Sequence, residues 1–236
     1  MVSEETIHIT NADGGSFGGV LFAPPASSAP AILMIPEMYG VNAYLREVAA
    51  RYVAHGYLVL AIDVLWRIEH NLVLKYDGPD SAAAHAYHDR FDFADGVSDM
   101  RAAIARLRTH PHANGRVGAV GFCLGGTMAY LAAARCGADA AAAYYGSRIV
   151  EFLDEASGIA APLEMHLGAL DATIPPAALA QLRATTAPNR TIATYVYDDA
   201  VHAFANHLRP DRYHPLATAQ AEARTFALFD RVLGGR

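Results

Sequence analysis

The stretch that decides the fold is GRVGAVGFCLGGTMAYLAAARC, residues 115–136. Its small and β-branched residues over 116–122 predict a buried strand, and residues 127–136 predict a helix that follows almost at once. Between the two stands Gly-Phe-Cys-Leu-Gly, with Cys123 flanked by Gly121 and Gly125. This is the pattern of a nucleophile elbow with cysteine in the serine position. Either the glycines form a tight turn around a small buried cysteine, or the turn presents a sulfur atom.

Strand-like and helix-like segments alternate along most of the remaining chain. Strands are predicted at 31–37, 57–63, 116–122, 139–146, 162–170 and 191–198, and helices at 41–57, 98–110, 127–136, 175–186 and 215–234. An N-terminal hairpin is predicted around the turn-rich NADGGS, and the polar residues 64–97 are predicted to pass over one end of the fold. This alternation is typical of a mostly parallel central sheet with helices on both faces, an α/β fold.

Composition excludes several classes of protein. The 236 residues are 53% hydrophobic and 18% charged, which is enough apolar material for a large core. The net charge of −6, with both signs interspersed, gives no basic surface for nucleic acid. No apolar run reaches the ~18 residues of a membrane helix, and MVSEETIHIT is no secretory signal. We therefore predict one domain over residues 1–236, cytoplasmic, without cofactor, and monomeric or weakly homo-oligomeric.

Three further polar residues follow predicted strands, as Cys123 does. They are Glu37, Asp171 in LGALDATIPP, and His202 in DDAVHAFAN. Because sites of parallel sheets form at the carboxyl ends of the strands, these side chains are expected to meet there. Elbow hydrolases carry their triad in the order nucleophile, acid, histidine, which is the order here. In that interpretation His202 is the general base, and Asp171 fixes its tautomer and orientation.

An elbow would also prepare the cysteine chemically. It places the sulfur at the N-terminus of the following helix, where backbone N–H groups and the helix dipole favour the thiolate. The N–H of Leu124 would point into an oxyanion hole, and Met38, after an earlier strand, is the expected second donor.

Each residue also has a structural interpretation. Cys123 could be a buried packing residue, Asp171 a helix cap, His202 a loop histidine, and Glu37 a cap for the helix that begins near Asn42. The joint placement of the three triad residues favours the catalytic interpretation.

Other candidates are weaker. Cys136, inside a predicted helix, is expected only to pack. His85 and His88, with nearby aspartates, lack a third zinc ligand at a convincing spacing, so no metal site is predicted.

At this point the sequence resembles the dienelactone hydrolases (carboxymethylenebutenolidases). The segments GRVGAVGFCLGG, PEMYGVNAYLREVAARYVAHGYLVLAID, YYG, LGALDATIP and VHAFA carry the resemblance, which extends from about residue 30 to the end. It implies an α/β-hydrolase fold without a separate cap domain, and a triad of Cys123, Asp171 and His202. It also implies that Glu37 holds the resting thiol and helps to deprotonate it when substrate displaces its carboxylate.

The resemblance extends to the substrate pocket, with one departure. It implies that Tyr145 lines the pocket, and Tyr39 and Phe204 are expected there too. Family members that act on dienelactone clamp its carboxylate with two arginines, whereas the matching positions here are Ser81 and Asn206. An amide cannot replace a guanidinium in bidentate carboxylate binding. Arg67, Arg90 and Arg148 are the candidates for a compensating cation.

The predicted function is hydrolysis of an ester or lactone, such as a carboxymethylenebutenolide, through a thioester. The alternative within this chemistry is an ester or lactone without a free carboxylate. Two other classes stay open: a thiol redox protein, which the absence of C-x-x-C disfavours, and a non-catalytic binding protein on a hydrolase scaffold.

Overall fold

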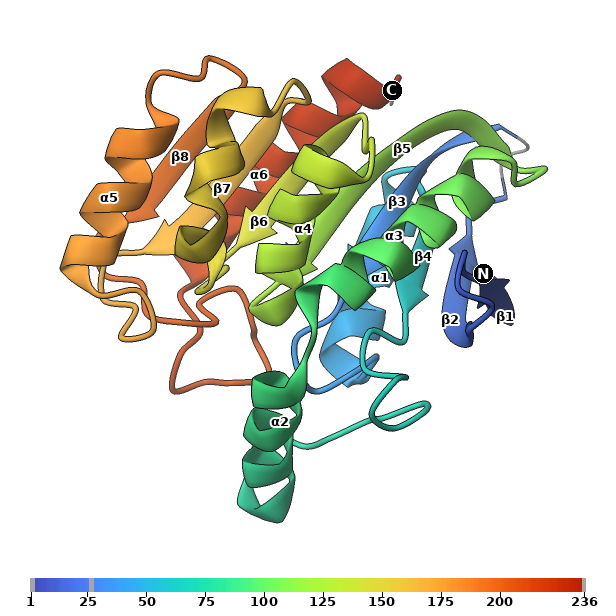
Figure 1. Ribbon diagram of the computed structural model, residues 1–236, viewed down its shortest axis with the longest axis horizontal. Coiled ribbons are helices and arrows are strands. Elements are labelled where there is room, and N and C mark those ends of the chain that lie inside the picture. The colour runs from blue at the N-terminus through green and yellow to red at the C-terminus, as the bar shows by residue number, and fades with distance from the viewer. Residues whose placement is uncertain (1–2, 26–27, 235–236) are drawn as a thin grey trace.

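The computed structural model describes residues 3–25 and 28–234. Its eight strands form one sheet in the order β1-β2-β4-β3-β5-β6-β7-β8 (Figure 1). The strands are β1 (Ser3–Thr10), β2 (Ser16–Ala23), β3 (Ala29–Ile35), β4 (Leu58–Ile62), β5 (Ala113–Phe122), β6 (Ala140–Tyr144), β7 (Leu163–Gly168) and β8 (Ile192–Tyr197). β2 pairs antiparallel with β1 and β4, and the strands from β4 to β8 are parallel.

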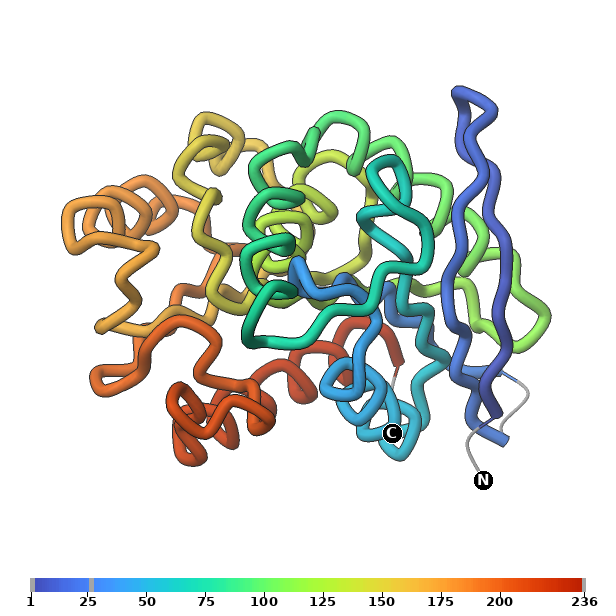
Figure 2. Tube along the Cα trace, turned by 90° about the horizontal axis from the view of Figure 1, so that it is seen from below, coloured from blue at the N-terminus to red at the C-terminus, as the bar shows by residue number. Residues whose placement is uncertain are grey.

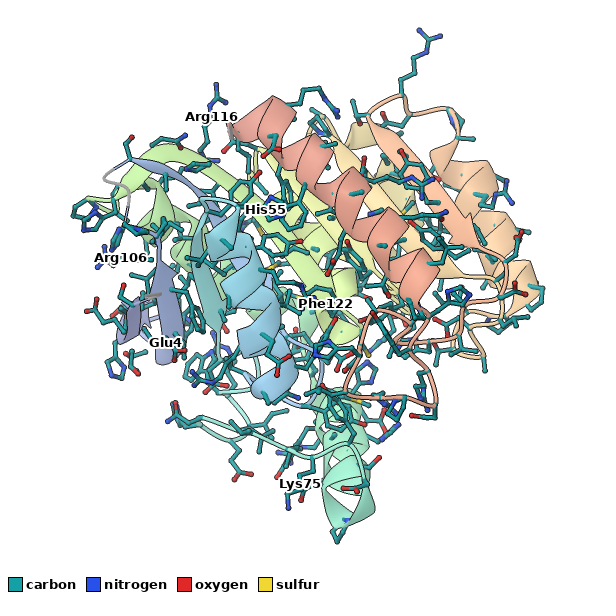
Figure 3. All side chains as sticks on the ribbon, turned by 180° about the vertical axis from the view of Figure 1, so that it is seen from behind. Glu4, His55, Lys75, Arg106, Arg116 and Phe122 are labelled. Carbon is teal, nitrogen blue, oxygen red and sulfur yellow. The ribbon has the colours of Figure 1, made fainter. Side chains whose placement is uncertain are left out.

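Helices cover both faces of the sheet. They are α1 (Ala43–Ala54), α2 (Gly78–Arg90), α3 (Phe93–Arg108), α4 (Leu124–Arg135), α5 (Pro176–Thr186) and α6 (Pro215–Leu233), with a 3-10 segment η1 (Ile149–Gly158). α3, α4 and α5 lie on the face seen in Figure 1, and α1 and α6 lie on the opposite face, seen in Figure 3. The predicted α/β-hydrolase architecture is therefore confirmed, and the described residues form no separate cap domain.

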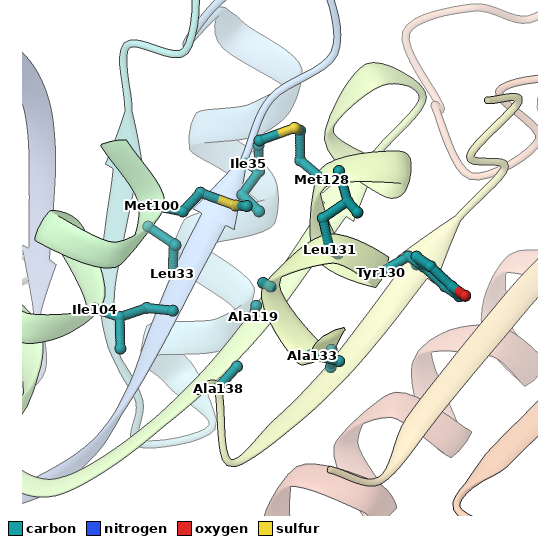
Figure 4. Close-up of a cluster of buried hydrophobic side chains, with 14 of the residues drawn as sticks. Leu33, Ile35, Met100, Ile104, Ala119, Met128, Tyr130, Leu131, Ala133 and Ala138 are labelled. Carbon is teal, nitrogen blue, oxygen red and sulfur yellow. The ribbon is translucent and has the colours of Figure 1, made fainter. Parts of the chain in front are cut away.

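The burial of the central strands explains why their apolar sequences predicted strands so clearly. β3, β4 and β6 are buried at every position, so they are apolar throughout rather than alternating. Figure 4 shows Leu33 and Ile35 of β3 packed with Met100 of α3 and with Met128 and Leu131 of α4. This core fixes the depth at which α4, and the turn before it, sits on the sheet.

The polar segment 64–97 contains more helix than its pattern indicated. α2 extends away from the body at the end where the parallel strands finish (Figure 1), and Figure 2 looks onto that end of the fold. Ala84 is its only buried residue, so the helix has no amphipathic signature. α3 begins at Phe93, earlier than predicted, because the Asp92 side chain accepts hydrogen bonds from the N–H groups of Ala94 and Asp95. None of the helices in the described ranges is long and apolar enough to cross a membrane.

Candidate active site

The turn between β5 and α4 has the geometry of a nucleophile elbow. Cys123 adopts φ 57° and ψ −114°, a strained backbone conformation for a residue other than glycine. A Cβ on Gly121 would lie 1.8 Å from the carbonyl oxygen of Gly125, and one on Gly125 would lie 2.1 Å from that of Ile35. The two glycines therefore allow α4 to approach β3 and β5 closely enough for the turn to close.

The elbow leaves two backbone donors free beside Cys123. Leu124 is the first residue of α4, so its N–H has no acceptor within the helix. Across the described residues, no hydrogen-bond acceptor is found for the N–H of Leu124 or of Met38. Met38 lines the same cavity as Cys123, as expected for the second donor of an oxyanion hole.

His202 and Asp171 come together at the ends of the last two strands. Nδ1 of His202 lies 2.8 Å from Oδ2 of Asp171, and both residues are buried. Their loops are in contact because Gly168, at the end of β7, lies against the backbone of Ala200, where a Cβ would come within 2.3 Å of the carbonyl oxygen. Thr173 completes the arrangement, since its hydroxyl donates to Asp171 Oδ1 at 2.6 Å.

The pKa values of His202 and Asp171 depend on the groups that surround them. Burial alone would lower the pKa of His202, but the nearby Cys123 side chain and the hydrogen-bonded Asp171 carboxylate raise it to about 10. Burial opposes ionisation of Asp171 as well, and the bonds from His202 and Thr173 nevertheless lower the pKa of its carboxyl group. The site therefore favours a protonated His202 beside an ionised Asp171.

Glu37 is buried at the end of β3, with His202 and Arg209 as the nearby positive charges. Burial is the largest influence and raises the pKa of its carboxyl group. Asn206 Nδ2 donates to Glu37 Oε2 at 3.2 Å, and Asn206 is itself fully buried. Glu37 Oε1 has no hydrogen-bond partner among the described residues. The carboxyl group is thus held by an amide, with one oxygen left available on the side of the cavity.

A cavity of about 230 Å³ joins these groups. Cys123, His202 and Glu37 line it. Its other walls carry Met38, Tyr39, Ser81, His85, His88, Ser147, Thr173, Ala203, Arg209 and Arg212. α2 thus contributes three residues to the site from the polar segment. The cavity wall is rich in groups that are or can become cations, and Glu37 is its single carboxyl group.

Comparison with known proteins identifies the family. The model of the dienelactone hydrolase family matches residues 17–233. The chain belongs to the dienelactone hydrolase family. A carboxymethylenebutenolidase from Pseudomonas putida is 33% identical over 202 residues, which cover 85% of this chain and 86% of the relative.

Two further relatives extend the comparison. Carboxymethylenebutenolidase 1 from Cupriavidus pinatubonensis is 33% identical and covers 94% of both chains. The solved structure of a dienelactone hydrolase-like promiscuous phosphotriesterase from metagenomic libraries superposes with a TM-score of 0.79. At 20% identity, over 98% of this chain and all of that one, it shows the shared fold. The protein is therefore a carboxylic ester hydrolase of this family with the α/β-hydrolase fold.

The aromatic residues expected in the pocket lie at different distances from the cavity. Tyr39 lines the cavity. Tyr145 lies behind it, with its ring 5.2 Å from that of His202. Phe204 is fully buried, its ring centroid lies 5.4 Å from that of Tyr145, and it is not among the residues that line the cavity. Asn206 does not line the cavity either, because it is buried and bonded to Glu37. Ser81 does line the cavity.

The three arginines considered as compensating cations lie outside the cavity at Cys123. Arg67 pairs with Asp99 and Asp13, and Arg148 pairs with Glu151. Neither lines the catalytic cavity, and Arg90 lines a different one.

Two other arginines, Arg209 and Arg212, do line the cavity at Cys123. They lie in the loop after His202, whose path the sequence did not reveal. Thr173 was also missed, although its place two residues after Asp171 suits a hydroxyl or backbone N–H that bonds an aspartate.

Proposed function

We propose that this hydrolase cleaves an ester or lactone with Cys123 as nucleophile, His202 as acid and base, and Asp171 as the group that orients His202. The observation that carries the proposal is the hydrogen bond between His202 and Asp171, beside a cysteine in a strained elbow. A packing cysteine has no need of such a turn, and a redox thiol has no need of the histidine and the acid.

The first half of the proposed reaction forms a thioester. The Cys123 thiolate attacks the carbonyl carbon, and the N–H groups of Leu124 and Met38 stabilise the oxyanion, at about 3 kcal/mol per donor. The carbon–oxygen bond then breaks, and His202 gives its proton to the departing alkoxide. At the start of the cycle the Cys123 proton lies on His202, and the entering substrate displaces the Glu37 carboxyl group that shares the cavity with Cys123.

The second half releases the acid. Neutral His202 takes a proton from water as that water attacks the thioester carbonyl carbon. The carbon–sulfur bond breaks, the carboxylic product leaves, and Cys123 returns as thiolate facing the imidazolium of His202. Asp171 keeps the same tautomer through both halves.

For the substrate we infer a carboxylated lactone of the carboxymethylenebutenolide kind. Arg209 and Arg212 on the cavity wall supply the positive charge that Ser81 and Asn206 do not. A neutral ester is the second candidate. It is favoured because Asn206 is already bonded to Glu37 and Arg212 lies 3.4 Å from Asp211.

The test of the proposed function compares the two cysteines. Cys123→Ala should abolish turnover of p-nitrophenyl acetate, while Cys136→Ala, which changes a half-buried thiol remote from the cavity, should keep it. Circular dichroism checks that both variants fold. Turnover by folded Cys123→Ala at the unmodified rate would contradict the triad assignment.

A further inference from the structure

A second cavity, of about 740 Å³, lies beside the catalytic one. It is bounded by segment 73–77, by residues 42–44 at the start of α1, and by the loop 208–211. Arg209 lines both cavities. We refer to this second cavity as the outer groove.

The wall between the two cavities is thin. The Tyr76 ring faces the outer groove, and the Arg209 guanidinium lies 5.1 Å from its centroid. The centroid of the Tyr39 ring, which lines the catalytic cavity, lies 4.6 Å from that of the Tyr76 ring. A substrate that passes over Arg209 would therefore leave one cavity and enter the other.

The outer groove carries exposed apolar surface. Val73 is 60% exposed and Leu208 is 42% exposed, and both line it. In the described part of the chain four large hydrophobic residues are exposed, and these are two of them. Apolar side chains gathered at a concave surface are typical of a binding site rather than of general surface.

Charge in the outer groove disfavours an anion. Three aspartates line it, Asp77, Asp80 and Asp211, against two cations, Lys75 and Arg209. An uncharged apolar group suits this lining, whereas a second carboxylate does not. The outer groove thus differs from the catalytic cavity, where cationic groups dominate.

The outer groove is tied to the catalytic loop. The N–H of Leu74 donates to the carbonyl of Tyr39 at 3.0 Å, and Val73 forms a β-bridge with Gly40. The segment that contains Val73 and Leu74 is therefore attached to the loop that carries Glu37 and Met38. This attachment fixes the distance between the groove and the attacked carbonyl.

We propose that the outer groove binds an apolar arm of the ester substrate whose carbonyl lies at Cys123. This inference rests on the proposed function for the position of the carbonyl. It defines the substrate class further, as esters or lactones with an uncharged apolar extension, and it assigns Val73 and Leu208 as specificity residues.

The test uses two neutral esters, so that carboxylate binding by arginines does not enter. Butyl butanoate has longer arms than ethyl acetate on both sides of the ester bond. Turnover by the intact chain is followed by pH-stat titration, and binding to Cys123→Ala by calorimetry. Burial of the added methylenes should favour butyl butanoate by at least about tenfold in kcat/KM and in Kd.

The double variant Val73→Asp/Leu208→Asp should remove this preference, so that kcat/KM for butyl butanoate falls to the same range as that for ethyl acetate. The matched control is Leu216→Asp, which charges a 64% exposed leucine of α6 outside the groove and should keep the preference. Because the substituted side chains are exposed, all variants should fold, and the single Leu208→Asp variant should give an intermediate loss.

Each outcome of these measurements either supports or overturns the proposal for the outer groove. Equal binding of the two esters, or a preference that survives in the double variant, overturns the proposal even if both esters are hydrolysed. The same holds if the double variant changes only the sedimentation coefficient, since the groove would then be a contact between copies of the chain. Preferential binding of butyl butanoate without turnover would support the groove and refute the proposed function.

Discussion

Nδ1 of His202 lies 2.8 Å from Oδ2 of Asp171, although the two residues are 31 positions apart and follow different strands. The contact exists because the loops after β7 and β8 touch through Gly168 and Ala200. It leaves the opposite side of the imidazole ring to the cavity that Cys123 lines. The arrangement therefore holds a histidine between an acid and a sulfur.

Loss of the Asp171 charge should impair the chemistry more than the fold. In Asp171→Asn, the amide no longer stabilises the imidazolium or fixes its tautomer, so kcat should fall by about 10³–10⁴-fold, as in other triads. The measurement is kcat for p-nitrophenyl acetate, with the melting temperature recorded in parallel. A folded variant that loses less than tenfold would show that Asp171 only caps its turn.

Gly121 should be intolerant of a side chain. Gly121→Ala places a Cβ 1.8 Å from a backbone carbonyl oxygen, so the elbow must shift, and the free energy of unfolding should drop by at least about 3 kcal/mol. Gly158→Ala is the matched control, since nothing lies within 4 Å of its Cβ position. Urea denaturation measures both, and equal effects of the two substitutions would argue against a tightly closed elbow.

Arg209 and Arg212 should discriminate between substrates by charge. Replacing both with glutamine should raise KM for a carboxylated lactone by about tenfold or more, because charge-assisted hydrogen bonds to the carboxylate are lost. KM for the corresponding lactone without the carboxylate should stay within about twofold, which is the control. If the two KM values rise together, the arginines shape the cavity rather than bind a carboxylate.

His202 should stay protonated well above its ordinary range. Its pKa is raised to about 10, so the ring should be cationic at pH 8 and lose its proton only as the pH approaches 10. Cys123→Ala removes a side chain that raises the pKa of His202, so deprotonation should move to a lower pH. Nitrogen-15 NMR of the ring reports the charge directly. A neutral ring at pH 8 in the unmodified chain would contradict the ion pair.

The sequence predicted the strand–helix framework and the order of the triad because both leave strong local patterns. Buried parallel strands are continuously apolar, and the elbow requires glycines at fixed positions around Cys123. α2 was missed as a helix because it packs only Ala84 into the body, and η1 was missed altogether. A helix that buries almost nothing gives no hydrophobic periodicity to detect.

The cations of the site could not be predicted for a different reason. Arg209 and Arg212 lie in the loop between β8 and α6, whose path depends on contacts across the fold. Asn206, for example, turns inward to bond Glu37, 169 positions earlier in the chain. Asn206 therefore holds the Glu37 carboxyl group from within the protein. Arg209 and Arg212, which line the cavity, come later in the same loop.

Cysteine labelling tests most directly whether the Cys123 thiol carries the reaction. Iodoacetamide is added near neutral pH, labelling is mapped by mass spectrometry, and ester turnover is measured on the same samples. Cys136 is the internal control, since burial raises the pKa of its thiol to about 12. We expect a single label, on Cys123, and a loss of turnover in proportion to the labelled fraction. Full labelling of Cys123 with turnover retained would contradict this role of Cys123.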